Sequence, residues 1–148
     1  MEKPLTKEFE VKWADLDPNR HMRHSAYNDY GAHMRVKILE SIGLTMAKLE
    51  SLKIGPILFR EETKFYREVG MEGVITVTAA LSKSRADASR WSFVHEMYRS
   101  DGIKAAVIEV DGAWLDINKR KLAIPPQEII DLFLSMPKAE NFILENVK

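Results

Sequence analysis

The sequence contains no cysteine. A chain without cysteine cannot form a disulfide bond, bind zinc through thiolates or use a thiol as its nucleophile. It also lacks a surplus of either charge, since 22 Lys and Arg residues balance 22 Asp and Glu residues. Proteins that bind nucleic acids carry a basic surplus, so this balance argues against a nucleic-acid partner. A net charge near zero suits a chain that associates with copies of itself.

Long apolar segments are also missing. No stretch approaches the roughly 18 apolar residues that a membrane-spanning helix needs. The first residues, from Met1 to Pro4, are charged and are followed by no apolar run of the kind found in secretory signals. We therefore expect a cytoplasmic protein without a membrane span. The 148 residues contain no repeat or linker, which predicts a single domain over residues 1–148.

The apolar spacing takes a helical period after residue 25. Side chains recur at steps of three and four residues, which predicts a helix from about Ala26 to about Ile42. Ser25 is the candidate N-cap of this helix, and Gly43 stands where a helix-ending glycine belongs. A shorter helix is expected over residues 45–51. The apolar stripe of the long helix consists of Tyr27, Tyr30, Met34, Ile38 and Ile42.

Most of the remaining chain has the pattern of β-strands. Residues 5–13 alternate, with Phe9, Val11 and Trp13 expected on the buried face. The Asp101-Gly102 pair predicts a hairpin turn. Further strands are expected over residues 57–67, 74–83, 91–99 and 103–117.

The C-terminal part is expected to be helical again. Pro125-Pro126 predicts the start of a helix, and a further short helical piece is expected from Ala139. The whole order predicts an α+β fold, with one helix packed against one curved antiparallel sheet. Such a sheet keeps open edges, and pairing with a second copy of the chain would cover one of them.

The residues suited to chemistry gather just before the long helix. Asp17 precedes Pro18, which fixes its own φ and pushes Asp17 toward extended backbone. The first turn of a helix has N–H groups without intrahelical partners, and these can polarise a carbonyl and stabilise an oxyanion. A carboxylate nearby can attack that carbon or deprotonate a water. The segment thus has the parts of an acyl-transfer site, although Asp before Pro also serves simply to form a turn.

Residues 11–27, which read VKWADLDPNRHMRHSAY, resemble the opening motif of the 4-hydroxybenzoyl-CoA thioesterase family. The shared pattern is an aromatic-x-Asp-x-Asp turn followed by the start of a helix with an Ala-x-Tyr-like sequence. Residues 115–125 are similar to the last strand of that family and the segment that follows it. The resemblance covers nearly the whole chain and includes the thioesterases associated with the Tol–Pal system.

The resemblance implies a hotdog fold, in which one long central helix is wrapped by a curved antiparallel sheet of five to six strands, with a C-terminal helix. It implies a homodimer with a continuous sheet, which is often paired again into a homotetramer, and active sites at the subunit boundary. The implied activity is hydrolysis of a small or medium acyl-CoA, without a metal or other cofactor.

The family pattern also implies roles for particular residues. Asp17 falls on the catalytic carboxylate, and His24 falls on a position that is functional in some members. The helix start at Ser25, Ala26 and Tyr27 would bind the thioester carbonyl and the acyl group. One departure is Arg20, which stands where many members have Gly.

Two arginines could bind the phosphates of CoA. Arg85 and Arg90 flank one expected hairpin tip, and guanidinium groups pair well with phosphates. The alternative is that they are solvated turn residues. The two histidines His21 and His24 could in principle bind a metal, but their spacing outside a helix fixes no ligand geometry.

Two other functions remain open at this point. The first is a non-catalytic hotdog protein that binds acyl-CoA or acyl carrier protein as a scaffold. The second is a hotdog dehydratase, which needs a His and an acidic residue in a Gly-rich motif that this sequence does not show.

Overall fold

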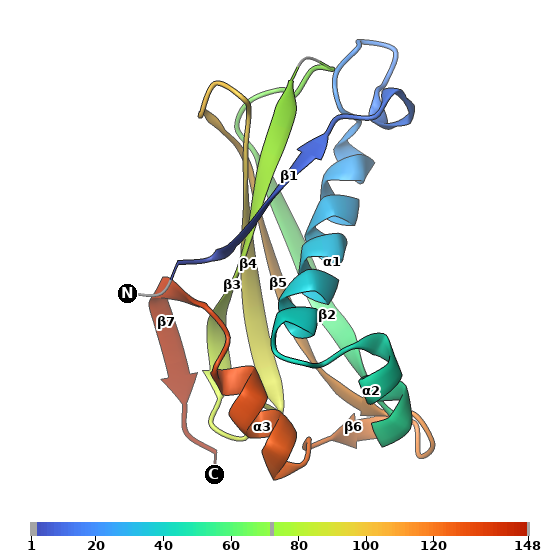
Figure 1. The fold of residues 1–148 in the computed structure, drawn as a ribbon, viewed down its shortest axis with the longest axis vertical. Helices are drawn as coiled ribbons and strands as arrows, with labels where there is room; N and C mark the ends of the chain where they lie inside the picture. The colour runs from blue at the N-terminus through green and yellow to red at the C-terminus, as the bar shows by residue number, and fades with distance from the viewer. Residues whose placement is uncertain (1–2, 72, 148) are drawn as a thin grey trace.

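The computed structural model describes residues 3–71 and 73–147. Its central feature is α1 (His24–Ser41), which lies along one face of a curved sheet (Figure 1). The sheet runs in the order β1-β3-β4-β5-β2, with β6 added to β5 and β7 added to β3. This is the hotdog arrangement that the resemblance implies. No helix of the described residues is long and apolar enough to cross a membrane.

The elements follow the chain in an order that matches most of the expected pattern. The long helix, the short helix after it, the helix that follows Pro125-Pro126 and all five expected strands are confirmed, with ends that move by a few residues. The bounds are β1 (Leu5–Glu10), the 3₁₀ turn η1 (Trp13–Asp15), α1 (His24–Ser41), α2 (Met46–Leu52), β2 (Ile54–Phe65), β3 (Val74–Arg85), β4 (Arg90–Tyr98), β5 (Lys104–Asp116), β6 (Lys121–Ala123), α3 (Gln127–Leu134) and β7 (Lys138–Glu145).

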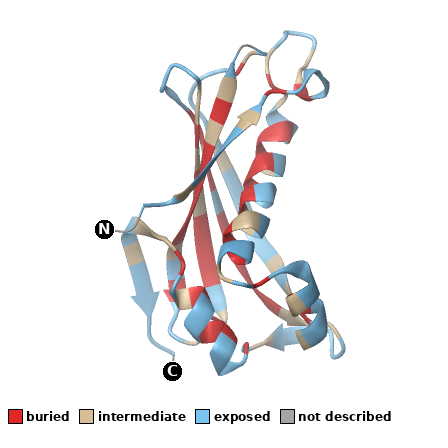
Figure 2. Cartoon of the chain, viewed as in Figure 1, coloured by how far each residue is buried: buried red, intermediate tan, exposed pale blue. Residues whose placement is uncertain are grey.

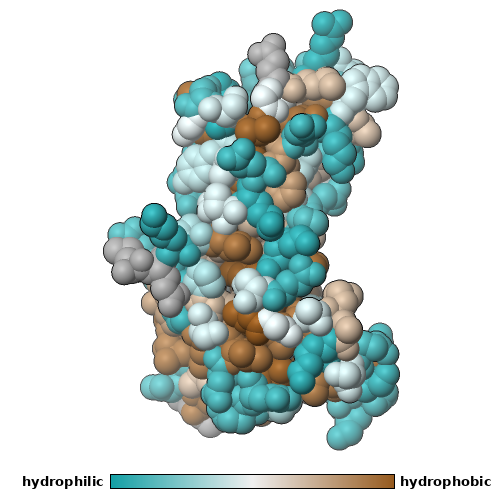
Figure 3. All heavy atoms as spheres, in the orientation of Figure 1, coloured by the Kyte–Doolittle hydropathy of each residue, from teal (hydrophilic) through white to brown (hydrophobic). Residues whose placement is uncertain are grey.

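The core lies between the inner face of the sheet and α1 (Figure 2). Alternate residues of β3 and β4 are buried there, as the period of two predicts. In β3 these are Ile75, Val77, Ala79 and Leu81, and in β4 they are Trp91, Phe93, His95 and Met97. The face in Figure 3 gathers its hydrophobic surface in the lower half, around α3 and the C-terminal end of α1.

Two expectations about the chain ends are wrong. The segment from Ala139 is not helical but belongs to β7, which pairs in parallel with the end of β3. The sheet of the described residues therefore has seven strands rather than five or six. Trp13 is not on a buried strand face, because β1 ends at Glu10 and Trp13 is 77% exposed in η1.

The ends of α1 differ from the expected caps in one respect. Gly43 has φ +86°, and the N–H of Leu44 reaches back to the carbonyl of Leu39, which is the glycine-ended helix terminus that was predicted. Ser25 is not the N-cap, because the helix begins at His24 and Arg23 precedes it in extended conformation.

Arg20 adopts a left-handed backbone, with φ of 64°. The turn thus keeps the conformation that glycine adopts easily, at a cost of about 1 kcal/mol for a residue with a Cβ. We expect Arg20→Gly to raise the free energy of unfolding by about 0.5 kcal/mol, the balance of relieved strain and added chain entropy. Urea denaturation measures the change. Lys12→Gly is the control, because Lys12 is already extended and its replacement should only destabilise.

Candidate functional site

A tight turn presents Asp17 just before α1. The N–H of Asp17 donates to the carbonyl of His21 at 2.8 Å, and the N–H of Arg20 donates to the carbonyl of Asp17 at 2.9 Å. The carboxylate Oδ1 of Asp17 accepts the N–H of Asn19 at 2.9 Å and that of His21 at 3.3 Å. One oxygen of this half-buried carboxylate is therefore held by the turn, which aims the side chain in a defined direction.

The first turn of α1 follows seven residues after Asp17. His24 and Ser25 are exposed there, while Ala26 and Tyr27 are buried. The N–H groups of His24 and Ser25 have no carbonyl one turn earlier in the helix to bind. The Oγ of Ser25 accepts the Nε–H of Arg23 at 3.1 Å, so this side chain leaves the backbone donors uncapped. The helix start can accordingly bind an oxygen that carries negative charge.

Tyr27 faces the interior next to this turn. Its ring packs edge-on against Phe65, with 4.9 Å between ring centroids. Burial raises the pKa of Tyr27, the backbone hydrogen bond at Val69 acts in the opposite direction, and the charges of Asp17 and Glu68 raise it further. The side chain of Tyr27 thus stays neutral at physiological pH and lies within the electrostatic reach of Asp17.

A buried cluster that sequence reasoning missed fixes the turn on the helix. Asp15 accepts the hydroxyl of Tyr30 at 2.6 Å and lies 3.4 Å from the guanidinium of Arg23. Arg23 also donates to the carbonyl of Ala14 at 2.7 Å. Burial raises the pKa of Tyr30 strongly, and its bond to Asp15 adds to the increase. Asp15 therefore anchors the 3₁₀ turn to α1, whereas Asp17, two residues later, is left for other chemistry.

A cavity of about 660 Å³ opens beside the same turn. Its lining includes side chains of positive and of negative charge. His21 lies 3.8 Å from Glu68, and Arg99 is paired with Asp101. No carboxylate lies within ion-pair distance of Arg20 among the described residues. The lining residues are Arg20, His21, Glu68, Val69, Gly70, Met71, Val74, Ile75, Arg99, Ser100 and Asp101.

The structure does not bring the two predicted arginines to this end of the molecule. Arg85 and Arg90 flank the turn between β3 and β4, next to α3 and β7 and far from the start of α1 (Figure 1). The guanidinium of Arg90 lies over the ring of Phe59 at 4.7 Å. Within one chain they cannot contact a small ligand at Asp17, and their role as CoA contacts stays a prediction.

A second buried polar pair lies further along α1. His95 on β4 is 1% exposed, and its Nδ1 is 3.0 Å from the carbonyl of Thr78, so Nδ1 carries the proton. Its Nε2 is then an acceptor for Arg35, 3.1 Å away. Burial and the charge of Arg35 lower the pKa of His95 to about 3. The alternation of apolar and polar residues in β4 predicts that His95 is buried. Nothing in the sequence indicates that its partner is Arg35, sixty residues earlier.

This pair predicts a loss of stability in mild acid. The unfolded chain protonates His95 below about pH 6.5, while the folded chain does so only near pH 3. The stability is therefore full above pH 6.5 and is lost as the pH falls toward 3, by about 2 kcal/mol at pH 5. Urea denaturation at pH 7 and pH 5 measures it. In His95→Gln, the difference in the free energy of unfolding between pH 7 and pH 5 should be smaller by about 2 kcal/mol. An unchanged difference would contradict the assignment.

His21 and His24 are the two histidines of this region. Among residues 3–71 and 73–147, no group of three or more His, Asp or Glu side chains is placed to hold a metal ion. His21 and His24 therefore have no third ligand beside them in the described chain.

Comparison with known proteins places this geometry in context. Residues 11–133 match the model of the thioesterase-like superfamily. A Staphylococcus aureus protein solved in complex with CoA is 22% identical, with a TM-score of 0.84 over 90% of this chain and 84% of that one. A 1,4-dihydroxy-2-naphthoyl-CoA thioesterase from Synechocystis is 16% identical, with a TM-score of 0.78 over 90% of this chain and 97% of that one. No curated protein matches the sequence.

Proposed function

This chain belongs to the thioesterase-like superfamily, and from that premise we propose that it hydrolyses the thioester bond of a small or medium acyl-CoA. The observation that carries the proposal is the placement of Asp17, whose carboxylate is oriented by two backbone N–H groups just ahead of the uncapped start of α1. A carboxylate and an oxyanion-binding helix start are together able to hydrolyse a thioester.

The proposed reaction uses these two groups in turn. The carbonyl oxygen of the thioester binds the N–H groups at the start of α1, next to His24 and Ser25. Asp17 takes a proton from water while the water oxygen bonds to the carbonyl carbon. Collapse of this intermediate breaks the C–S bond, and the departing sulfur receives the proton from Asp17. The products are a free acid and CoA, and the thiolate leaves well enough that no second acid is needed.

The neighbouring residues have supporting roles in this proposal. Ala26 leaves room for the carbonyl at the helix start, and Tyr27 closes the inner side of the site without carrying charge. His24 is exposed at the first position of the helix, where its backbone N–H, its ring or both would contact the substrate. The 660 Å³ cavity beside Arg20 would receive part of CoA.

We further propose that the active unit is a homodimer formed through β2. Among the described residues β2 pairs with β5 on one side only, so its other edge can pair with a second β2. This strand exposes Leu58, Phe59 and Phe65, which are 40%, 52% and 51% accessible. Size-exclusion chromatography with light scattering tests the dimer, and a stable monomer at micromolar concentration would rule out a shared site.

Release of free thiol from a panel of acyl-CoAs tests the activity. We expect turnover of at least one small or medium acyl-CoA by the purified chain. The competing function is a scaffold that binds acyl-CoA without hydrolysis. Binding by calorimetry without thiol release on any member of the panel would favour that scaffold over an enzyme.

A further inference from the structure

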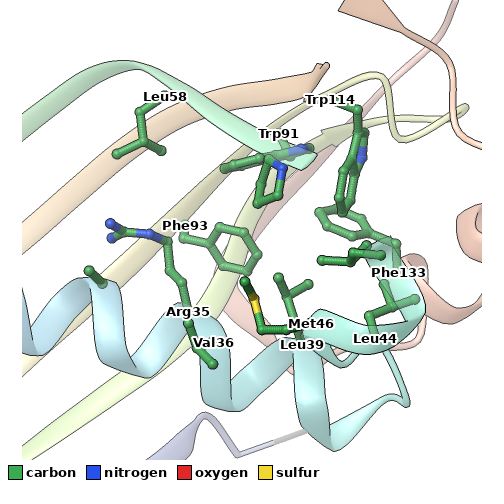
Figure 4. Close-up of a pocket in the computed structure, with 13 residues that line it drawn as sticks. Arg35, Val36, Leu39, Leu44, Met46, Leu58, Trp91, Phe93, Trp114 and Phe133 are labelled. Carbon is green, nitrogen blue, oxygen red and sulfur yellow. The ribbon is translucent and has the colours of Figure 1, made fainter. Parts of the chain in front are cut away.

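A second cavity, of about 220 Å³, lies beneath the C-terminal half of α1 (Figure 4). Its wall toward the sheet is aromatic, and its rim is formed by α1, α2 and the early part of β2. At roughly 30 Å³ per small group, it has room for about seven heavy atoms. The lining residues are Ala32, Arg35, Val36, Leu39, Leu44, Met46, Leu49, Pro56, Leu58, Trp91, Phe93, Trp114 and Phe133.

The polar groups of this lining are all hydrogen-bond donors. None of the lining side chains carries an oxygen atom. The indole N–H groups of Trp91 and Trp114 are buried and have no hydrogen-bond partner in the described part of the chain. Buried donors are rarely left unpaired, and each one costs the free energy of its lost hydration. Both nitrogens are closed to solvent and to the cavity, so a ligand there would meet Arg35 as the polar side chain of an otherwise apolar lining.

Arg35 adds a charge that is only partly balanced. Its side chain is 13% exposed, and its one carboxylate neighbour among the described residues is Glu61, at 3.7 Å. Its other contact is His95, which is neutral because burial and the charge of Arg35 lower its pKa to about 3. By contrast, the more exposed Arg60 has three carboxylates within 4 Å. A buried guanidinium with one loose partner has the capacity to pair with a second carboxylate.

The position of Arg35 relative to Asp17 decides which site the cavity can serve. Arg35 follows His24 by eleven residues, which is about 16 Å along a helix. A group of about seven atoms cannot span that distance within one chain. In the proposed dimer, however, the β2 strands of the two chains pair in antiparallel fashion. The N-terminal half of β2 in one chain then lies beside the C-terminal half of β2 in the other. The C-terminal half is the part beside the helix start, since Thr63 bonds to Asn28 at 2.5 Å.

We propose that this cavity holds the acyl group of the substrate and selects one that ends in a carboxylate, which pairs with Arg35. The inference rests on the proposed thioesterase function and on the dimer, with the thioester at Asp17 of the partner chain. The methylene chain lies against Phe93 and the tryptophans, while the terminal carboxylate meets the guanidinium at the end of the cavity near Leu58 (Figure 4).

Adipoyl-CoA and hexanoyl-CoA form the test pair, because they share a six-carbon chain and differ only in a terminal carboxylate or methyl group. We expect kcat/KM for adipoyl-CoA to exceed that for hexanoyl-CoA by at least about tenfold, since a buried charged site rejects a ligand that lacks the matching group. In Arg35→Met the ratio should fall to about one. A wild-type preference for hexanoyl-CoA, or a ratio that Arg35→Met leaves unchanged, would overturn the inference.

Two further variants separate recognition from a loss of structure. Glu61→Gln removes the competing carboxylate and should raise the ratio, which damage to the fold would not do. Lys37→Met removes a more exposed cation of the same helix as Arg35 and should leave the ratio unchanged. If Arg35→Met does not fold, Arg35→Lys serves in its place, and the ratio should fall because Lys lacks the planar fork. No change in the ratio with either Glu61→Gln or Arg35→Lys counts against the role of Arg35.

A binding measurement distinguishes failure of this inference from failure of the proposed function. The sequence has 3 tryptophans, and Trp13→Phe leaves Trp91 and Trp114 in the cavity wall as the fluorescent reporters. Both CoA esters are titrated into this variant with Asp17→Asn added. Tighter binding of adipoyl-CoA that depends on Arg35 supports the inference even if no thioester is hydrolysed. Equal binding of the two esters overturns it, whatever the turnover.

Discussion

Asp17→Asn is expected to lower kcat for the best acyl-CoA by at least about 1,000-fold and to change its affinity by less than about threefold. The amide oxygen of Asn can still accept the N–H groups of Asn19 and His21, so the turn keeps its shape. An amide can neither take a proton from water nor attack the carbonyl carbon. Steady-state thiol release measures kcat, and calorimetry with a slowly hydrolysed acyl-CoA measures affinity.

Asp29→Asn is the matched control for this prediction. Asp29 is an exposed carboxylate in the early part of α1, and it forms no hydrogen bond or ion pair with another described side chain. The change in net charge is the same as in Asp17→Asn, so a general effect on the binding of the anionic CoA would appear in both variants. Near-normal turnover by Asp17→Asn would show that another group activates water.

The strands and α1 were predictable because their burial depends on local spacing. The alternation of β4 places Trp91, Phe93 and His95 in the core, as the period of two requires. Trp13 fails this rule because β3 begins at Val74, opposite Glu10, and offers no strand partner to residues beyond it. The chain therefore leaves the sheet and forms η1.

In the C-terminal segment, by contrast, an available strand partner overrides the local preference for helix. Residues 139–145 contain good helix formers, but so short a helix is marginal without packing. The free edge of β3 offers its backbone instead, and the N–H of Ala86 donates to the carbonyl of Glu145. Pro137 accepts the N–H of Leu81 at the start of the same pairing. The conformation of this segment thus depends on pairing with β3, about sixty residues earlier in the sequence, which local residue spacing does not reveal.

The site divides in the same way. The Asp17 turn and the start of α1 are local features. The Asp17-Pro18 pair predicts the turn, and the change of apolar spacing to a helical period predicts the helix. Arg35 and His95 meet only because α1 crosses β4. The role of Asp15 was equally hidden, because two acids in one motif look alike until the partners of each are known.

Asp15→Ala is expected to lower the free energy of unfolding by about 3 kcal/mol. The substitution leaves the buried hydroxyl of Tyr30 without its acceptor and removes the carboxylate beside Arg23. Urea denaturation followed by circular dichroism measures the loss. Because the same contacts hold the turn on α1, the activity of the folded fraction should also fall, through a misplaced Asp17.

A double-mutant cycle with Tyr30→Phe separates the pair from its surroundings. Tyr30→Phe alone should cost about 1–2 kcal/mol, since it removes the donor but leaves Asp15 beside Arg23. Once the hydroxyl is gone, Asp15→Ala should cost less than it does in the wild type, by about 1 kcal/mol or more. Strictly additive costs would mean that Asp15 acts through Arg23 alone. In that case Arg23→Met, and not Tyr30→Phe, should reproduce most of the loss.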